Sequence, residues 1–233
     1  MGLGKTIQTL ALILTHPRPP PAEGSSRSTA KLCNGTLLVV PLALAEQWRR
    51  EIEEKTTLKA YVHHGPKREK DPARIAKWDV VITTFDTVSS EWRGPTEDPE
   101  PEIHGRGIFL VNWWRIVLGI HYMVKINLDE AHTIKNPRAK MSLAACALTA
   151  QFRWCLTGTP YQNTVDDIFS LVRFLRIPPF AERKYWKERI TRPSKADNSS
   201  LALTRLRTLL RAIMLRRTKD ILKVFPCCSL TLG

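Results

Sequence analysis

The chain has 233 residues, 43% of them hydrophobic, so it can bury the core of one large or two small domains. Its formal net charge of +14 favours an anionic partner such as nucleic acid or a membrane surface. Its five cysteines are odd in number and lack the paired spacing of a zinc site or a disulfide framework. This composition excludes a disulfide-rich secreted domain and indicates an intracellular protein with reduced thiols.

The first predicted element is a phosphate-binding loop followed by a helix. Gly2-Leu3-Gly4-Lys5-Thr6 stands directly before the apolar run Ile7 to Leu14. Glycines let backbone N–H groups surround phosphates, and the positive end of a helix adds to their attraction. Lys5 would reach the β- and γ-phosphates, and the Thr6 hydroxyl would bind Mg²⁺. A chance Gly-Lys-Thr at a helix start is the alternative, whereas the glycine motif argues against a signal peptide.

Strand-like and helix-like runs then alternate along the chain. This order predicts a parallel sheet with helices on both faces, the RecA-like α/β layout. The segment from Ile108 to Val124 is interrupted by Asn112, Arg115 and His121, so we expect two consecutive buried strands there and no membrane span. The expected strands are 36–40, 80–84, 125–128 and 154–157, and the expected helices are 43–55, 138–149 and 165–175.

Composition also predicts loops and boundaries. Residues 16–35 and 93–107 are rich in Pro, Gly, Ser or acids, and we expect mobile surface insertions there. Residues 1–200 form the predicted lobe, 201–223 a basic helical segment, and 224–233 a tail without a recognisable pattern. Between Arg173 and Lys223, fifteen Lys or Arg residues stand against four acids, which indicates either an anion-binding surface or a solvated helical face.

Two further polar motifs follow apolar runs. In Asp129-Glu130-Ala131-His132, Asp129 can hold Mg²⁺ and Glu130 can orient and deprotonate the attacking water. Alone, this box would equally suit an acidic helix N-cap. Leu156-Thr157-Gly158-Thr159-Pro160, with Gln162-Asn163, adds a third polar loop. Because ligands bind at the carboxyl ends of parallel strands, we expect the three loops to share one site.

The ordered set of motifs resembles the first lobe of the Swi/Snf family of helicase-like ATPases. The resemblance implies ATP and Mg²⁺ as cofactors, double-stranded DNA and chromatin proteins as partners, a nuclear location and no membrane. Arg153-Trp154-Cys155-Leu156 resembles the DNA-repair branch. The motifs are MGLGKT at the N-terminus, Val39-Val40-Pro41 with Gln47-Trp48, Val81 to Phe85, Asp129 to Asn136, Leu156 to Asn163 and Met214 to Lys219.

The same resemblance assigns roles beyond the ATP site. Pro41, Thr83 and Thr84 would lie near the DNA backbone. The Thr157-Gly158-Thr159 loop, with Gln162 and Asn163, would couple ATP to DNA. Arg216 and Arg217 would lie in the connection to a second RecA-like lobe, which this sequence does not include; a basic helix end is the alternative. Trp48 and Trp113-Trp114 are expected in the core.

Three departures from the family pattern lower the expected activity. The sequence begins inside the phosphate loop, so we expect weak ATP binding. Ten residues, Gly119 to Leu128, separate Arg115–Leu118 from the Asp129 box. Either Lys125–Leu128 replaces a displaced Arg115–Leu118 strand, or the insertion bulges at the catalytic edge. Our hypothesis is that the ten inserted residues are translated intron sequence, and sequencing the mature transcript would test it. An arginine finger from the second lobe is worth roughly 10³ to 10⁵ in rate, so we expect negligible turnover.

Two alternatives remain open. A non-catalytic lobe could bind DNA or a protein through the basic C-terminal region. An incomplete gene product without a stable fold would fail to show a cooperative thermal unfolding transition.

Overall fold

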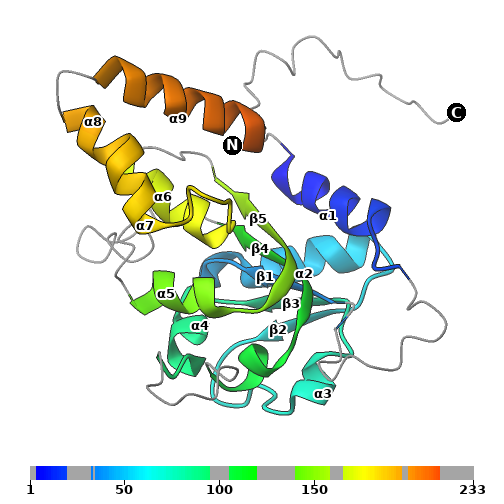
Figure 1. Ribbon diagram of the computed structural model, residues 1–233. Coiled ribbons are helices and arrows are strands. Elements are labelled where there is room, and N and C mark those ends of the chain that lie inside the picture. The colour runs from blue at the N-terminus through cyan, green and yellow to red at the C-terminus, as the bar shows by residue number, and fades with distance from the viewer. Residues whose placement is uncertain are drawn as a thin grey trace, which may run out of the picture.

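The computed structural model describes residues 4–19, 33, 35–94, 105–119, 140–157, 165–195 and 199–215. Its centre is a five-stranded parallel sheet in the order β2-β3-β1-β4-β5 (Figure 1). The three inner strands are buried on both faces, which explains their nearly continuous apolar sequences. The strands are β1 (Thr36–Val39), β2 (Ala60–His63), β3 (Val80–Thr83), β4 (Trp113–Gly119) and β5 (Ala150–Leu156).

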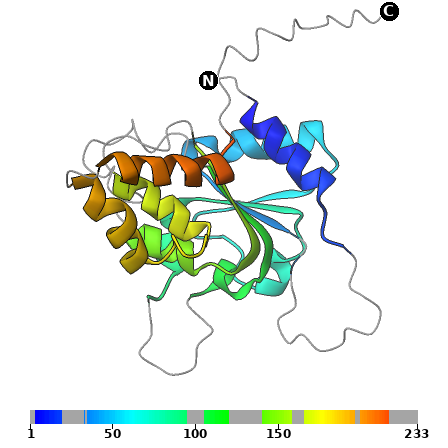
Figure 2. The same cartoon turned by 45° about the horizontal axis from the view of Figure 1, so that its top comes forward.

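Helices cover both faces of this sheet, as Figures 1 and 2 show. Alternating side chains of the inner strands separate the two layers: Leu38, Ile82 and Val117 pack towards α1 and α2. Leu37, Val81 and Ile116 pack on the other side, with α4 and α5. The predicted α/β arrangement is therefore confirmed. The helices are α1 (Lys5–Thr15), α2 (Leu42–Lys55), α3 (Pro72–Ile75), α4 (Phe85–Glu91), α5 (Lys140–Ala147), α6 (Val165–Phe174), α7 (Arg183–Trp186), α8 (Arg192–Lys195) and α9 (Ser199–Ile213), with a 3₁₀ turn η1 (Gly107–Leu110) and a π-helical turn η2 (Lys187–Thr191).

A third apolar cluster lies among the C-terminal helices. Phe169 of α6 and Trp186 of α7 are buried against Leu206 and Leu209 of α9. α9 (Ser199–Ile213) covers the first part of the basic helical segment predicted at 201–223, and it packs onto the lobe through its apolar stripe. No helix in the described part of the chain has the length and apolarity to cross a membrane.

Of the two buried strands predicted within 108–124, the structure shows one in the described part, residues 108–119, while residues 120–124 lie outside the described residues. Gly107–Leu110 forms the turn η1, and β4 follows it as the single strand of the described part of this segment. Arg115–Leu118 pairs with β1 on one side and β5 on the other, so it is not displaced from the sheet. Residues 125–128, the predicted replacement strand, lie outside the described residues.

The predicted surface insertions are wrong at their ends. Cys33 is 4% exposed and belongs to the core, while a Cβ on Gly35 would come within 2.7 Å of the Trp78 carbonyl oxygen. Gly107 is buried as well. Trp114, expected in the core, is partly exposed and its indole N–H donates to the His16 carbonyl oxygen. Composition predicted loops here but could not show which of their residues pack against the sheet.

Candidate functional site

The carboxyl ends of the strands meet at one edge of the sheet. The backbone N–H of Val40 donates to the Thr83 carbonyl oxygen at 2.9 Å, which ties β1 to β3. The Thr83 hydroxyl donates to the His63 carbonyl oxygen at 3.0 Å, which ties β3 to β2. Pro41, Thr84 and His64, the residues that follow these ends, therefore lie along the same edge.

The other half of this edge belongs to β4 and β5. Gly119, the last residue of β4, pairs with Leu156, and Thr157 follows directly. A Cβ on Gly119 would lie only 2.9 Å from Cγ1 of Val40, so the close packing of β4 against β1 requires glycine here. Thr157 thus lies at the edge that also carries Pro41 and Thr84.

α1, which begins at Lys5, is directed towards the same edge. At its C-terminal end, the His16 carbonyl oxygen accepts a hydrogen bond of 2.8 Å from the Arg115 guanidinium, near the amino end of β4. The 11 residues of α1 extend about 16 Å from there. Figures 1 and 2 show that α1 runs from there towards the carboxyl edge, so its N-terminal end lies on that side.

The local geometry around Lys5 fits a phosphate ligand. Gly4 is the N-cap of α1, and its φ of 66° is a left-handed conformation that glycine adopts without strain. Partial burial lowers the pKa of Lys5, because it disfavours the charged ammonium group. Thr6 hydrogen-bonds to Glu51 of α2, so its hydroxyl would have to leave this carboxylate to bind a metal ion.

Thr83 and Thr84 are placed at the predicted edge, but their side chains are buried. Thr83 is 0% and Thr84 2% exposed. Thr84 is the N-cap of α4, and its hydroxyl oxygen accepts the Thr87 backbone N–H at 3.2 Å. These hydroxyls therefore stabilise the edge from within. Sequence reasoning did not single out His64, which is exposed beside them and lies within hydrogen-bond distance of Thr87. No local pattern links the two residues, because they lie 23 positions apart in the sequence.

Several predicted site residues lie outside the described residues, so their placement stays a prediction. They are Gly2, Leu3, Asp129, Glu130, Gly158, Thr159, Gln162, Asn163, Arg216 and Arg217. Within the described ranges, no group of three or more His, Cys, Asp or Glu side chains could hold a metal ion.

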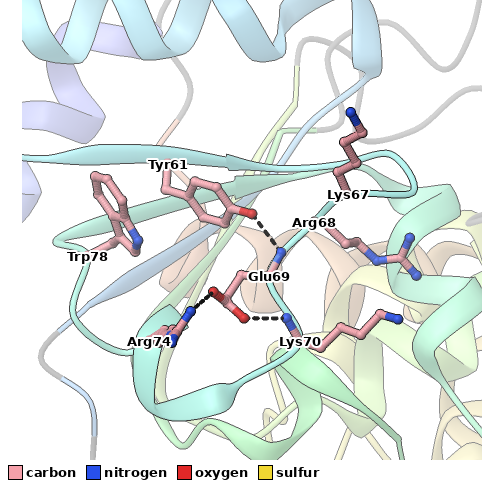
Figure 3. A pocket seen from close by; sticks show the side chains of 7 residues that line it. All are labelled: Tyr61, Lys67, Arg68, Glu69, Lys70, Arg74 and Trp78. Carbon is pink, nitrogen blue, oxygen red and sulfur yellow. Dashed lines mark hydrogen bonds and ion pairs between the residues drawn. The ribbon is translucent and has the colours of Figure 1, made fainter.

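A shallow pocket lies beside the edge strand β2 (Figure 3). Tyr61 and Trp78 stack with their ring centroids 5.3 Å apart, and the Tyr61 hydroxyl oxygen accepts the Glu69 N–H. The Glu69 carboxylate accepts hydrogen bonds from the Lys70 N–H and the Arg74 guanidinium. The Glu69 carboxylate thus pairs with Arg74, one of the basic residues that line this pocket.

A parallel sheet with a phosphate-loop lysine and polar strand ends at one edge defines a RecA-like nucleotide-binding lobe. The SNF2-related domain matches residues 1–231, and this chain belongs to that family.

Relatives and solved structures support this membership. The chain is 36% identical to DNA repair protein RAD5A of Arabidopsis thaliana over 94% of its own length and 24% of the relative. It is 36% identical to DNA repair protein rad5 of Neurospora crassa, covering 94% of this chain and 19% of that protein. The chain thus spans a quarter or less of these relatives. The Sulfolobus solfataricus SWI2/SNF2 ATPase core in complex with dsDNA superposes with a TM-score of 0.64 at 25% identity, covering 97% of this chain and 41% of that one.

Proposed function

We propose that this chain forms the first motor lobe of an ATP-dependent translocase of double-stranded DNA. The observation that carries the proposal is the convergence of the α1 N-terminus and the ends of all five strands on one edge of the sheet. Membership of the SNF2-related family and the likeness to an ATPase core solved with dsDNA support it.

In the proposed ATP site, the Gly2 to Thr6 loop holds the phosphates and Lys5 contacts the β- and γ-phosphates. Thr6 and Asp129 hold Mg²⁺, whose charge would balance that of the phosphates. Glu130 orients the attacking water and accepts its proton. The partly desolvated Lys5 at the start of α1 is the described feature that fits these roles.

In the proposed DNA site, the duplex backbone runs past Pro41 and the Thr83-Thr84 strand end. Thr157, Gly158 and Thr159, with Gln162 and Asn163, connect this site to the ATP site, and Arg216 and Arg217 lead towards a second lobe. Action on chromatin in the nucleus, in the service of DNA repair, belongs to the same proposal, because relatives are named as DNA repair proteins.

Nucleotide binding by the 233-residue polypeptide tests the ATP site. With a fluorescent ATP analogue and Mg²⁺, we expect weak binding that Lys5→Ala abolishes and Glu130→Gln preserves, since Lys5 contacts the phosphates whereas Glu130 acts on the attacking water. Lys77→Ala, which removes an exposed lysine, is the control. Binding that is unchanged by Lys5→Ala would refute the site. Turnover should be negligible, so robust DNA-stimulated hydrolysis by this polypeptide would contradict the expected dependence on a second lobe.

A non-catalytic DNA-binding lobe is the second candidate. It is favoured by α9, which buries Leu206 and Leu209 and turns Arg207 and Arg211 to solvent. Salt-dependent DNA affinity that survives both Lys5→Ala and Glu130→Gln, without nucleotide binding by the unmodified chain, would select this function.

A further inference from the structure

We propose that His64 is a DNA-phosphate contact of this lobe and that the buried carboxylate of Glu91 is a positioning residue that holds it in place. The inference rests on the proposed function, because it assumes that duplex DNA runs along the carboxyl edge of the sheet.

The positioning cluster consists of His63, Arg68 and Glu91. Nε2 of His63, the last residue of β2, lies 2.9 Å from Oε1 of Glu91 at the end of α4. Nε of Arg68 donates to the same oxygen at 2.6 Å, and the Ile108 backbone N–H donates to Oε2 at 3.1 Å. One carboxylate therefore joins β2, the loop after it, α4 and η1.

Burial and charge indicate that this carboxylate is ionised and strongly held. Glu91 is 6% and His63 0% exposed. Burial opposes ionisation of Glu91, but hydrogen bonds from His63 and Arg68 outweigh it and hold the pKa of this carboxyl below its usual value. Nδ1 of His63 is buried without a hydrogen-bond partner among the described residues. Because a carboxylate can only accept, Nε2 of His63 carries a proton and donates to Glu91.

The backbone closes tightly around Glu91. The Arg106 N–H donates to the Glu91 carbonyl oxygen at 3.0 Å. A Cβ on Gly107, whose φ is 52°, would lie 2.6 Å from Oε2 of Glu91, and a Cβ on Gly105 would lie 2.6 Å from the Glu91 carbonyl oxygen. The backbone therefore leaves room for little besides this carboxylate. Since His63 at the end of β2 is hydrogen-bonded to Glu91, the end of β2 is held in a fixed position.

His64 receives a second support from α4. Its Nδ1 lies 3.2 Å from Oγ1 of Thr87, and that hydroxyl lies 2.9 Å from Oγ1 of Thr84. Since Oγ1 of Thr84 accepts the Thr87 N–H, a consistent assignment has the Thr84 hydroxyl donating to Thr87 and the Thr87 hydroxyl donating to Nδ1 of His64. The proton of a neutral His64 then resides on Nε2, on the far side of the ring.

The position of Nε2 suits a phosphate. His64 is exposed and directly follows β2, beside the Thr84 strand end that is proposed to face DNA. The loop that follows it carries Lys67, drawn in Figure 3, which adds positive charge nearby, while Arg68 is paired with Glu91. An N–H donor held in one orientation beside a lysine is an arrangement by which side chains contact a duplex backbone without reading its sequence.

The test is duplex-DNA affinity of the 233-residue chain, measured by fluorescence anisotropy at several salt concentrations. We expect His64→Ala to weaken binding by about fivefold, the value of one hydrogen bond. Glu91→Gln should also weaken it, although removing a negative charge favours DNA binding on purely electrostatic grounds. Glu53→Gln, the same change at an exposed position of α2, is the control and should leave affinity equal or slightly higher.

A double-mutant cycle separates positioning from general destabilisation. In the His64→Ala background, Glu91→Gln should cause no further weakening, because the contact it positions is gone. Equal weakening in both backgrounds, or wild-type affinity of His64→Ala, would overturn the inference. If Glu91→Gln does not fold, as judged by its thermal unfolding transition, Thr87→Val takes its place in the cycle, because it removes the hydroxyl that contacts Nδ1 of His64. Thr87→Val should then weaken DNA binding only when His64 is present. Absence of DNA binding by the unmodified chain would instead refute the proposed DNA site itself.

Discussion

The carboxyl edge of the sheet is held together mainly by hydrogen bonds of a few buried side chains. Glu91 accepts hydrogen bonds from two side chains and one backbone N–H, and Thr84 caps α4 while Thr83 ties β3 to β2. Burying a carboxylate is costly unless such partners are present, and removing it leaves them unpaired. The residues that hold this edge together are therefore those least visible from solvent.

Glu91 also makes stability depend on pH. Because the folded state lowers the pKa of this carboxyl, its contribution is complete above the unfolded value of about 4.3 and disappears as the pH falls through the folded value. In urea unfolding, Glu91→Gln should cost about 2 kcal/mol at pH 7 and clearly less at pH 3. A deficit that stays the same at both pH values would contradict an ionised Glu91.

Individual elements are placed by their apolar stripes. α2 buries Ala45, Trp48 and Ile52 at helical spacing against one face of the sheet. α9 does the same with Leu206 and Leu209, although its sequence is rich in arginine. A charged helix is thus integrated into the lobe because a narrow apolar face suffices to pack it.

This packing of α9 can be measured with two leucines. Leu206 is 7% exposed and Leu203 is 45% exposed. Leu206→Ala should reduce the free energy of unfolding by about 3 kcal/mol, since it leaves a cavity against α6 and η2. Leu203→Ala should change it by less than about 0.5 kcal/mol. Similar small effects of both substitutions in urea unfolding would show that α9 is not part of the cooperative unit.

At the scale of the whole molecule, charge and topology act together. The net charge of +14 attracts a polyanion from any side, but the strand order places the phosphate-loop end of α1 and the β2-β3 end on one edge. In the proposed function, this edge is the path along which the duplex binds.

The salt dependence of DNA binding distinguishes a defined surface from diffuse attraction. Arg207→Gln with Arg211→Gln removes two exposed charges from α9. If both arginines bind phosphates, the slope of log affinity against log salt should become shallower by about 1 for each arginine that is replaced. The matched pair Arg50→Gln with Lys77→Gln removes two exposed charges elsewhere and should change the slope little. Equal slopes for both pairs would indicate diffuse attraction.

The sequence by itself determined the layout of the lobe, because alternating apolar runs leave a parallel sheet few arrangements other than helices on both faces. It also indicated the phosphate loop, because glycines next to Lys5 at the start of a helix form a pattern typical of phosphate binding. The short strand Ala60–His63 escaped prediction because its two central residues, Tyr61 and Val62, are partly exposed and the strand forms no continuous buried run.

The tertiary structure alone decided which residues of these motifs are available. Thr83 and Thr84 lie at the carboxyl end of β3, yet their hydroxyls are used inside the protein. The cluster around Glu91 joins residues separated by 17 to 28 positions. No local pattern encodes such contacts, because they form only when β2, α4 and η1 pack together. The phosphate loop could be predicted from the sequence because its motif consists of adjacent residues.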